Sequence, residues 1–223
     1  MEATGIDFSE LSPTVGATYR LSDNSSLYAS VSRSFETPTT TEFDNPGGGG
    51  FNLNLTSQKA MNYEIGSRGR VSFGQARMVY SLALFQIDIS DSLVPYELPQ
   101  FPGREFFRNA GASTRRGLEV SVQAEVGDGF TVGLDYTLSD FSYDSFETDN
   151  ADFSGNTLPG IPRHFGSLFL EYAGPSGFFA TWRTRLIGSF YANDANSEHI
   201  DGYSISDLRV GYLFSSANWE IEP

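Results

Sequence analysis

Residues 117–141 read GLEVSVQAEVGDGFTVGLDYTLSDF, and this stretch decides the fold. In its first arm the apolar side chains alternate with polar ones and share one face: Leu118, Val120, Val122, Ala124 and Val126. The second arm repeats the alternation with Phe130, Val132, Leu134, Tyr136 and Leu138. A period of two is typical of a strand whose two faces meet different surroundings. Gly127-Asp128-Gly129 can adopt the positive φ angles of a tight turn, so we predict a β-hairpin.

Composition narrows the class of protein. The chain has 223 residues and a formal net charge of -14. Because binding to nucleic acid requires a basic surface that neutralises phosphates, we expect no nucleic-acid partner. Cysteine is absent, which excludes disulfides, thiolate metal sites and a cysteine nucleophile. No apolar run approaches the roughly 20 residues of a membrane-spanning helix, and the first residues do not resemble a signal peptide. A membrane β-barrel needs no such helix.

The rest of the chain repeats the pattern of the hairpin. Alternating segments predict further strands at residues 13–21, 27–35, 60–71, 77–89, 162–172, 178–191 and 203–214, with another beginning near the last residues. Short turns alternate with longer connections, which we place at residues 36–59, 90–109, 142–161 and 192–202. The first is polar, the second is rich in proline and aromatic residues, and the last is of medium length. No segment keeps helical spacing over an 11-residue window. Outer-membrane barrels show this alternation, with short periplasmic turns at one rim and long extracellular loops at the other.

A soluble β-sandwich binding module is the main alternative for such alternating strands. Three features favour a membrane barrel instead. The predicted strands are long enough for a tilted crossing, aromatic residues gather near their ends, and the long loops all fall at one end. In a barrel Val120, Val122, Leu134 and Tyr136 would face lipid, while Glu119, Glu125 and Asp135 would face a wet lumen. The hairpin turn would then lie at the periplasmic rim.

Five segments in order carry a resemblance to a known family. They are SPTVGATYRLSDNSSLYASVSRSFETPT from Ser12, NYEIGSRG from Asn62, FFRNAGASTRRGLEVSVQAEVGDGFTVGLDYTLSDF from Phe106, LPGIPRHFGSLFLEY from Leu158 and IDGYSISDLRVGYLF from Ile200. Together they resemble the barrel of TonB-dependent outer-membrane receptors. The resemblance implies an all-β, antiparallel, up-and-down transmembrane β-barrel in the outer membrane of a Gram-negative cell. It also implies active uptake of a scarce nutrient, most often a ferric siderophore, with energy from the TonB complex.

The chain departs from the full pattern of that family. We count about ten strands where the family has 22, and we find no plug domain, no TonB-box segment and no final strands. We therefore expect residues 1–223 to be part of a larger receptor barrel that meets TonB through a segment not in this chain. The alternatives are a receptor of the same family for cobalamin or a carbohydrate, or a small self-contained outer-membrane barrel acting as an adhesin or structural protein.

The candidate ligand-binding residues lie in the predicted long connection at residues 90–109: Tyr96, Phe101, Arg104, Phe106 and Arg108. Aromatic rings and fork-shaped guanidinium donors suit an anionic, partly aromatic iron chelate. The same residue types are also expected as interfacial aromatics and loop-packing charges, and that explanation is the more common one.

Nothing in the sequence indicates catalysis or a resident cofactor. The two histidines, His164 and His199, have no evident nucleophile partner, and we expect both to be structural or solvent-facing. We predict no enzymatic activity, no metal site and no cofactor.

Overall fold

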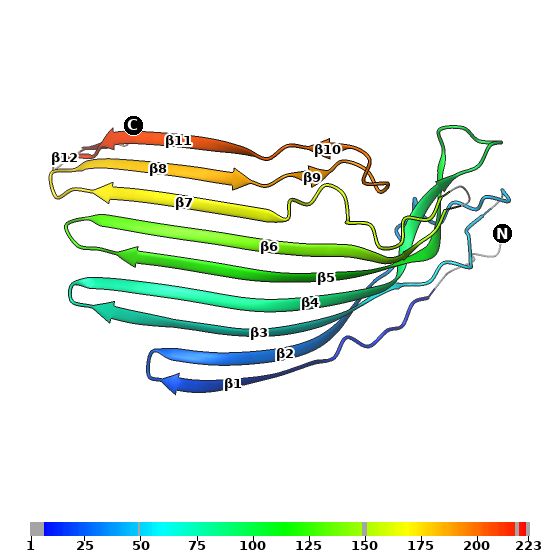
Figure 1. Cartoon of the computed structure of the whole chain (residues 1–223), viewed down its shortest axis with the longest axis horizontal. Helices are drawn as coiled ribbons and strands as arrows, with labels where there is room; N and C mark the ends of the chain where they lie inside the picture. The colour runs from blue at the N-terminus through cyan, green and yellow to red at the C-terminus, as the bar shows by residue number, and fades with distance from the viewer. Residues whose placement is uncertain (1–6, 49, 149–150, 217–218, 222–223) are drawn as a thin grey trace.

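The computed structural model describes residues 7–48, 50–148, 151–216 and 219–221. These residues contain no helix, and so none that is long and apolar enough to cross a membrane. They form one antiparallel sheet of nine strands, in which each strand lies beside its neighbour in the sequence (Figure 1). The strands are β1 (Thr14–Ser22), β2 (Ser25–Glu36), β3 (Gln58–Phe73), β4 (Ala76–Glu97), β5 (Glu105–Glu125), β6 (Phe130–Phe146), β7 (His164–Ala173), β8 (Phe178–Ile187) and β11 (Tyr203–Tyr212). The predicted all-β, up-and-down architecture is confirmed.

Two short strand pairs extend this sheet. β9 (Phe190–Tyr191) pairs with β10 (His199–Ile200), and β12 (Phe214–Ser216) pairs with β13 (Trp219–Ile221). Within the described residues β1 and β11 each have a single neighbour, so the nine-stranded sheet is an open part of a barrel. A β-sandwich requires a second sheet packed face to face with the first, and the described strands form none. The sandwich alternative is therefore wrong.

The connections sort to opposite ends of the sheet, as the sequence predicted. The short turns between β1 and β2, β3 and β4, β5 and β6, and β7 and β8 lie together, and the long connections and residues 7–13 lie at the other end (Figure 1). In the β5–β6 turn Gly127, Asp128 and Gly129 all have positive φ angles, which accounts for the glycines of that turn. The register pairs Val120 with Tyr136 and Val122 with Leu134, as the alternation requires.

Residues 90–109 were predicted to be a loop, but most of them belong to strands β4 and β5. β4 and β5 have 22 and 21 residues, about twice the ten of β7, and they continue past the other strands as a two-stranded ribbon (Figure 1). Only residues 98–104 connect them. A register shift between Ile89 and Leu93 marks the base of the ribbon, and Asp91 there has a φ of 57°. β6 likewise continues to Phe146, into residues expected to be a loop.

Buried apolar side chains are few, and most lie near the long connections: Phe43, Leu55, Ala83, Ile89, Val94, Phe106, Phe146 and Leu158. A single-layer sheet has no second layer to cover it, so its packed core forms only where the connections fold over one another. The end of the sheet with the long connections is therefore the end with fixed tertiary structure beyond the strands.

Candidate ligand-binding site

One face of the sheet is a continuous apolar surface. Val122 lies opposite Leu134, and Leu134 lies opposite Leu168, so the three side chains point the same way. Leu134 and Leu168 are 39% and 38% exposed, which is unusual for large apolar side chains in a folded sheet. An exposed apolar surface that crosses every strand suits contact with lipid tails. It ends at the row formed by Leu118, Leu138 and His164, and the next row carries Arg116 and Asp140.

The opposite face carries the charges of the strands and corresponds to the lumen of a barrel. Ser121 donates a hydrogen bond to Asp135 at 2.7 Å, and Arg185 lies 3.4 Å from Asp207 on the neighbouring strand. Glu119 lies on this same face, because it is opposite Thr137 and next to Ser121 in the alternation. Charged groups recurring on one face are costly in a dry core but not beside water. The face therefore suits a hydrated path.

Three times on this lumen face an aromatic ring lies against a glycine of the next strand and beneath an arginine. The three sets are Tyr28 with Gly66 and Arg68, Phe169 with Gly133 and Arg183, and Phe179 with Gly211 and Arg209. The guanidinium carbons lie 5.7, 5.6 and 5.4 Å from the ring centres, within the range of cation–π attraction. A side chain larger than hydrogen at the glycine would displace the ring.

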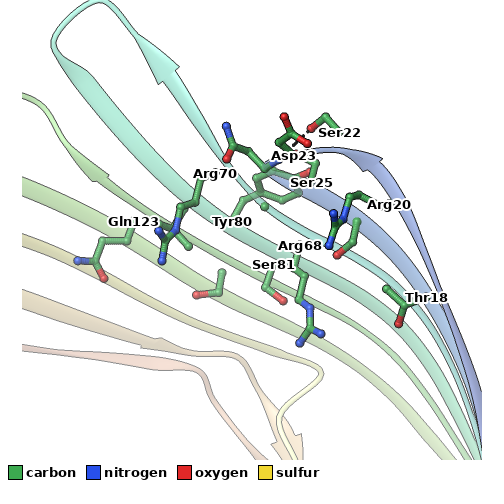
Figure 2. Close-up of a pocket in the computed structure, with 15 residues that line it drawn as sticks. Thr18, Arg20, Ser22, Asp23, Ser25, Arg68, Arg70, Tyr80, Ser81 and Gln123 are labelled. Carbon is green, nitrogen blue, oxygen red and sulfur yellow. Dashed lines mark hydrogen bonds between the residues drawn. The ribbon is translucent and has the colours of Figure 1, made fainter.

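A hollow at the short-turn end of the lumen face brings Arg68 together with two further arginines. Arg20, Arg68 and Arg70 line it with Asp23 and several neutral side chains, and Figure 2 shows them beside Tyr80 and Gln123. In the described part of the chain none of these arginines forms an ion pair with a carboxylate. The hollow therefore holds three arginines and one carboxylate, Asp23, although the whole chain is strongly acidic.

The five residues predicted to contact a ligand converge on the β4–β5 ribbon rather than on a loop. Tyr96 lies in β4, Phe106 and Arg108 lie in β5, and only Phe101 and Arg104 belong to the connecting turn. Phe106 is 1% exposed, with its ring centre 6.1 Å from that of Tyr96 and 5.8 Å from that of Phe101. Ladder pairing between Tyr96 and Phe106 places the two rings side by side.

Both arginines of this cluster already have partners within the chain. Arg104 donates from Nε and Nη2 to Asp44 Oδ2 at 3.2 and 2.7 Å, and it lies over the ring of Phe106. Arg108 donates to the carbonyl oxygen of Glu147 at 3.1 Å and lies over the ring of Tyr96. The cluster thus joins the ribbon to the connections after β2 and β6. Contact of these five residues with a ligand stays a prediction.

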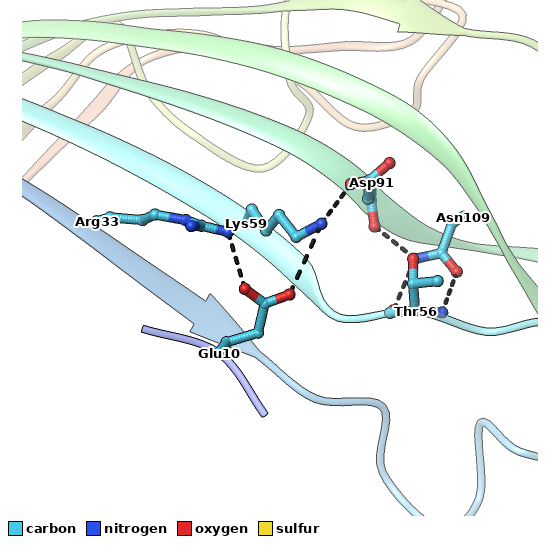
Figure 3. Close-up of polar contacts among 6 residues, drawn as sticks. All are labelled: Glu10, Arg33, Thr56, Lys59, Asp91 and Asn109. Atoms are coloured by element: carbon cyan, nitrogen blue, oxygen red, sulfur yellow. Dashed lines mark hydrogen bonds and ion pairs between the residues drawn. The ribbon is translucent and has the colours of Figure 1, made fainter. Parts of the chain in front are cut away.

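A polar network holds the base of the ribbon (Figure 3). Glu10 accepts a hydrogen bond from Arg33 at 2.8 Å, and Lys59 lies between Glu10 at 3.7 Å and Asp91 at 3.6 Å. Asn109 donates to the carbonyl oxygens of Asp91 and Thr56 at 2.7 and 2.9 Å, and its own side-chain oxygen accepts from Thr56 N at 2.8 Å. These contacts connect five separate segments of the chain at the register shift in β4.

Arg115 is a site residue that the sequence did not single out. It lies on the lumen face of β5, in the register row of Ile87 and Phe141, above the end of the apolar surface. Its side chain is half-buried, and its Nε atom is buried without a hydrogen-bond partner. In sequence it is one of two consecutive arginines, and nothing there distinguishes the paired Arg116 from the unpaired Arg115.

Tyr143 lies next to Arg115 and belongs to a fixed contact between β6 and the connection after β9. Its hydroxyl donates to Asp194 Oδ1 at 2.7 Å. Burial raises the pKa of Tyr143, and the Asp194 carboxylate raises it further by accepting a hydrogen bond from the protonated hydroxyl. Asn156 donates to the carbonyl oxygen of Asp194 at 2.8 Å. Asn196 accepts a hydrogen bond from Thr157 N through Oδ1 and donates one from Nδ2 to the carbonyl oxygen of Thr157, both at 2.8 Å. The wall beside Arg115 is therefore held by several strong contacts.

The two histidines take part in local contacts. His164 Nδ1 shares a hydrogen bond of 2.8 Å with the hydroxyl of Tyr136, and His199 lies 3.5 Å from Asp201 and edge-on to Tyr191. Among the described residues, no group of three or more histidine or carboxylate side chains is arranged to hold a metal ion.

Similarity to known proteins is consistent with this geometry. Over 116 residues the chain is 33% identical to the ferrichrome outer membrane transporter/phage receptor of Escherichia coli K12, covering 50% of this chain and 15% of that protein. Over 135 residues it is 26% identical to the ferrioxamine receptor of Yersinia enterocolitica, covering 59% and 18%. The crystal structure of the ferric-catecholate import receptor Fiu from E. coli K12 superimposes with a TM-score of 0.68 at 23% identity, covering 89% of this chain and 28% of that one.

The chain thus spans less than a fifth of the length of these two curated relatives. A family model described as "TonB dependent receptor-like, beta-barrel" matches residues 2–222, which is nearly the whole chain. Together with the open antiparallel sheet and its two contrasting faces, this match shows that the chain belongs to the β-barrel family of the TonB-dependent receptors of the outer membrane.

Proposed function

We propose that this chain forms part of an outer-membrane receptor that takes up ferric siderophores with energy supplied by the TonB complex. The main support for this proposal is the contrast between the two faces of the sheet. The apolar face suits contact with lipid, and the charged face suits a hydrated lumen. Relatives named for ferrichrome and for ferrioxamine support an iron chelate as cargo. The proposal gives the chain a role in binding and transport and no catalytic role.

We further propose that residues 1–223 supply about ten strands of a larger barrel. The chain covers 28% of the structurally similar ferric-catecholate receptor, which supports this view. A plug domain, the contact with TonB and the final strands would then come from other parts of the receptor. Lipid contacts the apolar face, and the ferric siderophore enters from the end that carries the long connections.

Deletion of the encoding gene in its bacterium tests the function. We expect uptake of iron-55 from a hydroxamate or catecholate chelate to fall to background, and a plasmid copy to restore it. Restoration should fail when TonB is absent or when the proton gradient is collapsed, and fractionation should place the protein in the outer membrane. Unchanged iron uptake together with lost cobalamin or oligosaccharide uptake would instead support a receptor for those nutrients.

A further inference from the structure

We propose that Arg115 is an anion-recognising residue of the lumen wall, and that it makes the receptor prefer iron chelates with a net negative charge. This inference rests on the proposed function, because it names the chemistry of the ligand that the receptor takes up.

Arg115 has no ion-pair or hydrogen-bond partner among the described residues, whereas other arginines near the long connections do. Arg33 pairs with Glu10, Arg104 with Asp44 and Arg163 with Asp140. Arg116 donates to Gln86 at 3.0 Å. Within the described residues Arg115 has no carboxylate within 4.0 Å and no hydrogen-bond partner for its buried Nε atom.

Partial burial changes what Arg115 can gain from a ligand. Its side chain has lost part of its hydration, and its buried Nε–H donor has no hydrogen-bond partner. An anionic oxygen that reaches the remaining donors of this half-buried guanidinium gains more than it would at a fully hydrated surface arginine, because less water screens the attraction. The planar fork of the guanidinium can also donate two parallel hydrogen bonds to a pair of oxygens.

The surroundings of Arg115 suit a flat, oxygen-rich ligand. Phe141 lies directly opposite Arg115 in the ladder and packs edge-on against Phe85 at 6.3 Å, which gives an aromatic wall on the lumen side. The hydroxyl of Tyr143 donates to Asp194 and so does not take up the donors of Arg115. The site therefore offers one free cation beside two rings on rigid strands.

These features favour a ferric tris-catecholate or a carboxylate-bearing chelate over a neutral one. Three catecholates bring more negative charge than iron(III) cancels, so their complex is anionic, whereas three hydroxamates leave the complex neutral. Catecholate rings can also stack on Phe141. A neutral chelate gains little from an unpaired arginine.

Ligand binding by the detergent-solubilised protein that carries this chain tests the inference. The probes are a ferric tris-catecholate complex and ferrichrome, a neutral tris-hydroxamate, each titrated while protein fluorescence is recorded. The variants are Arg115→Gln, Arg115→Lys and the matched control Arg116→Gln, which changes the next residue on the opposite face of the same strand. Circular dichroism and heat-modifiable gel migration confirm that each variant is folded.

We expect Arg115→Gln to weaken catecholate binding about tenfold, which corresponds to about 1.4 kcal/mol, with partial recovery in Arg115→Lys and no change in Arg116→Gln. Any ferrichrome binding should be unaffected. Equal catecholate binding by the wild type and Arg115→Gln overturns the inference while leaving the proposed function intact. Wild-type binding of ferrichrome alone also overturns it. Wild-type protein that binds neither chelate overturns the inference, and the gene-deletion experiment then decides the proposed function.

Discussion

Nη2 of Arg104 lies 2.7 Å from Oδ2 of Asp44, and this ion pair joins the tip of the β4–β5 ribbon to a connection 60 residues earlier in the sequence. Both side chains are about half exposed, so the pair contributes less than about 1 kcal/mol to global stability. Its effect is local, because it limits where the tip of the ribbon can lie.

Asp44→Ala is therefore expected to leave the unfolding midpoint nearly unchanged and to increase protease cleavage within residues 98–104. Limited proteolysis followed by mass spectrometry measures this. Asp23→Ala, in the turn at the other end of the sheet, is the matched control and should not alter cleavage at the ribbon. Equal cleavage of Asp44→Ala and the wild type would show that the rings alone fix the tip.

Phe106→Ala removes the most buried large side chain of the described residues. Truncation of a buried phenylalanine costs about 3–5 kcal/mol in a closed core. Here we expect the loss to fall on the ribbon, because the rings of Tyr96 and Phe101 that lie beside Phe106 belong to it. We expect hydrogen exchange in residues 92–109 to accelerate strongly while exchange in β7 and β8 is unchanged. Phe101→Ala, at a 42% exposed position, should have a smaller effect. A uniform acceleration across all strands would contradict this local role.

Val122→Arg and Gln123→Arg form a matched pair that tests which face of the sheet meets lipid. Val122 lies on the apolar face and the adjacent Gln123 lies on the lumen face, where it lines the hollow with Arg70. An arginine on the lipid face near the middle of the bilayer costs about 2–4 kcal/mol, whereas a lumen-facing arginine remains in water. Urea titration of the protein folded into lipid vesicles should therefore show a clear loss for Val122→Arg alone. Equal losses would mean that the faces are assigned wrongly.

Tyr143→Phe should make stability depend less steeply on alkaline pH. Because the pKa of Tyr143 is raised in the folded state above its ordinary value of 10.0, its stabilising contribution is complete below pH 10 and is lost as the pH rises towards the folded pKa. At pH 8 the variant lacks the hydrogen bond to Asp194 and should be less stable by about 1 kcal/mol. Between pH 10 and 12 the difference from the wild type should shrink. Denaturant midpoints measured across this range check the sign, and a growing difference would refute it.

Much of the sheet could be predicted because its two faces meet different media. In both arms of the hairpin, 118–126 and 130–138, every second side chain is apolar, so the common face of Val122 and Leu134 followed from sequence alone. The ribbon was missed because residues 92–109 extend beyond the apolar surface, where no lipid imposes a period of two. Pro95 also argued against a strand, yet it lies in the ladder opposite Phe107.

The candidate site was harder to predict because it depends on partners. The aromatic rings of Tyr96 and Phe106 and the guanidinium of Arg104 suggested ligand binding. The contact of Arg104 with Asp44 could not be predicted, because it depends on how two distant connections fold. The sequence did not single out Arg115, because the lack of a partner depends on how the side chains are arranged in three dimensions. The residue type of a charged side chain predicts what it can bind, and only the structure shows whether it is already bound.

The glycines opposite Tyr28, Phe169 and Phe179 leave room for these rings against the strands. A side chain at any of the three glycines would occupy space that the ring now fills, so the ring would have to stand away from the sheet. In a closed barrel the displaced rings and the guanidinium groups above them would then take up more of the lumen.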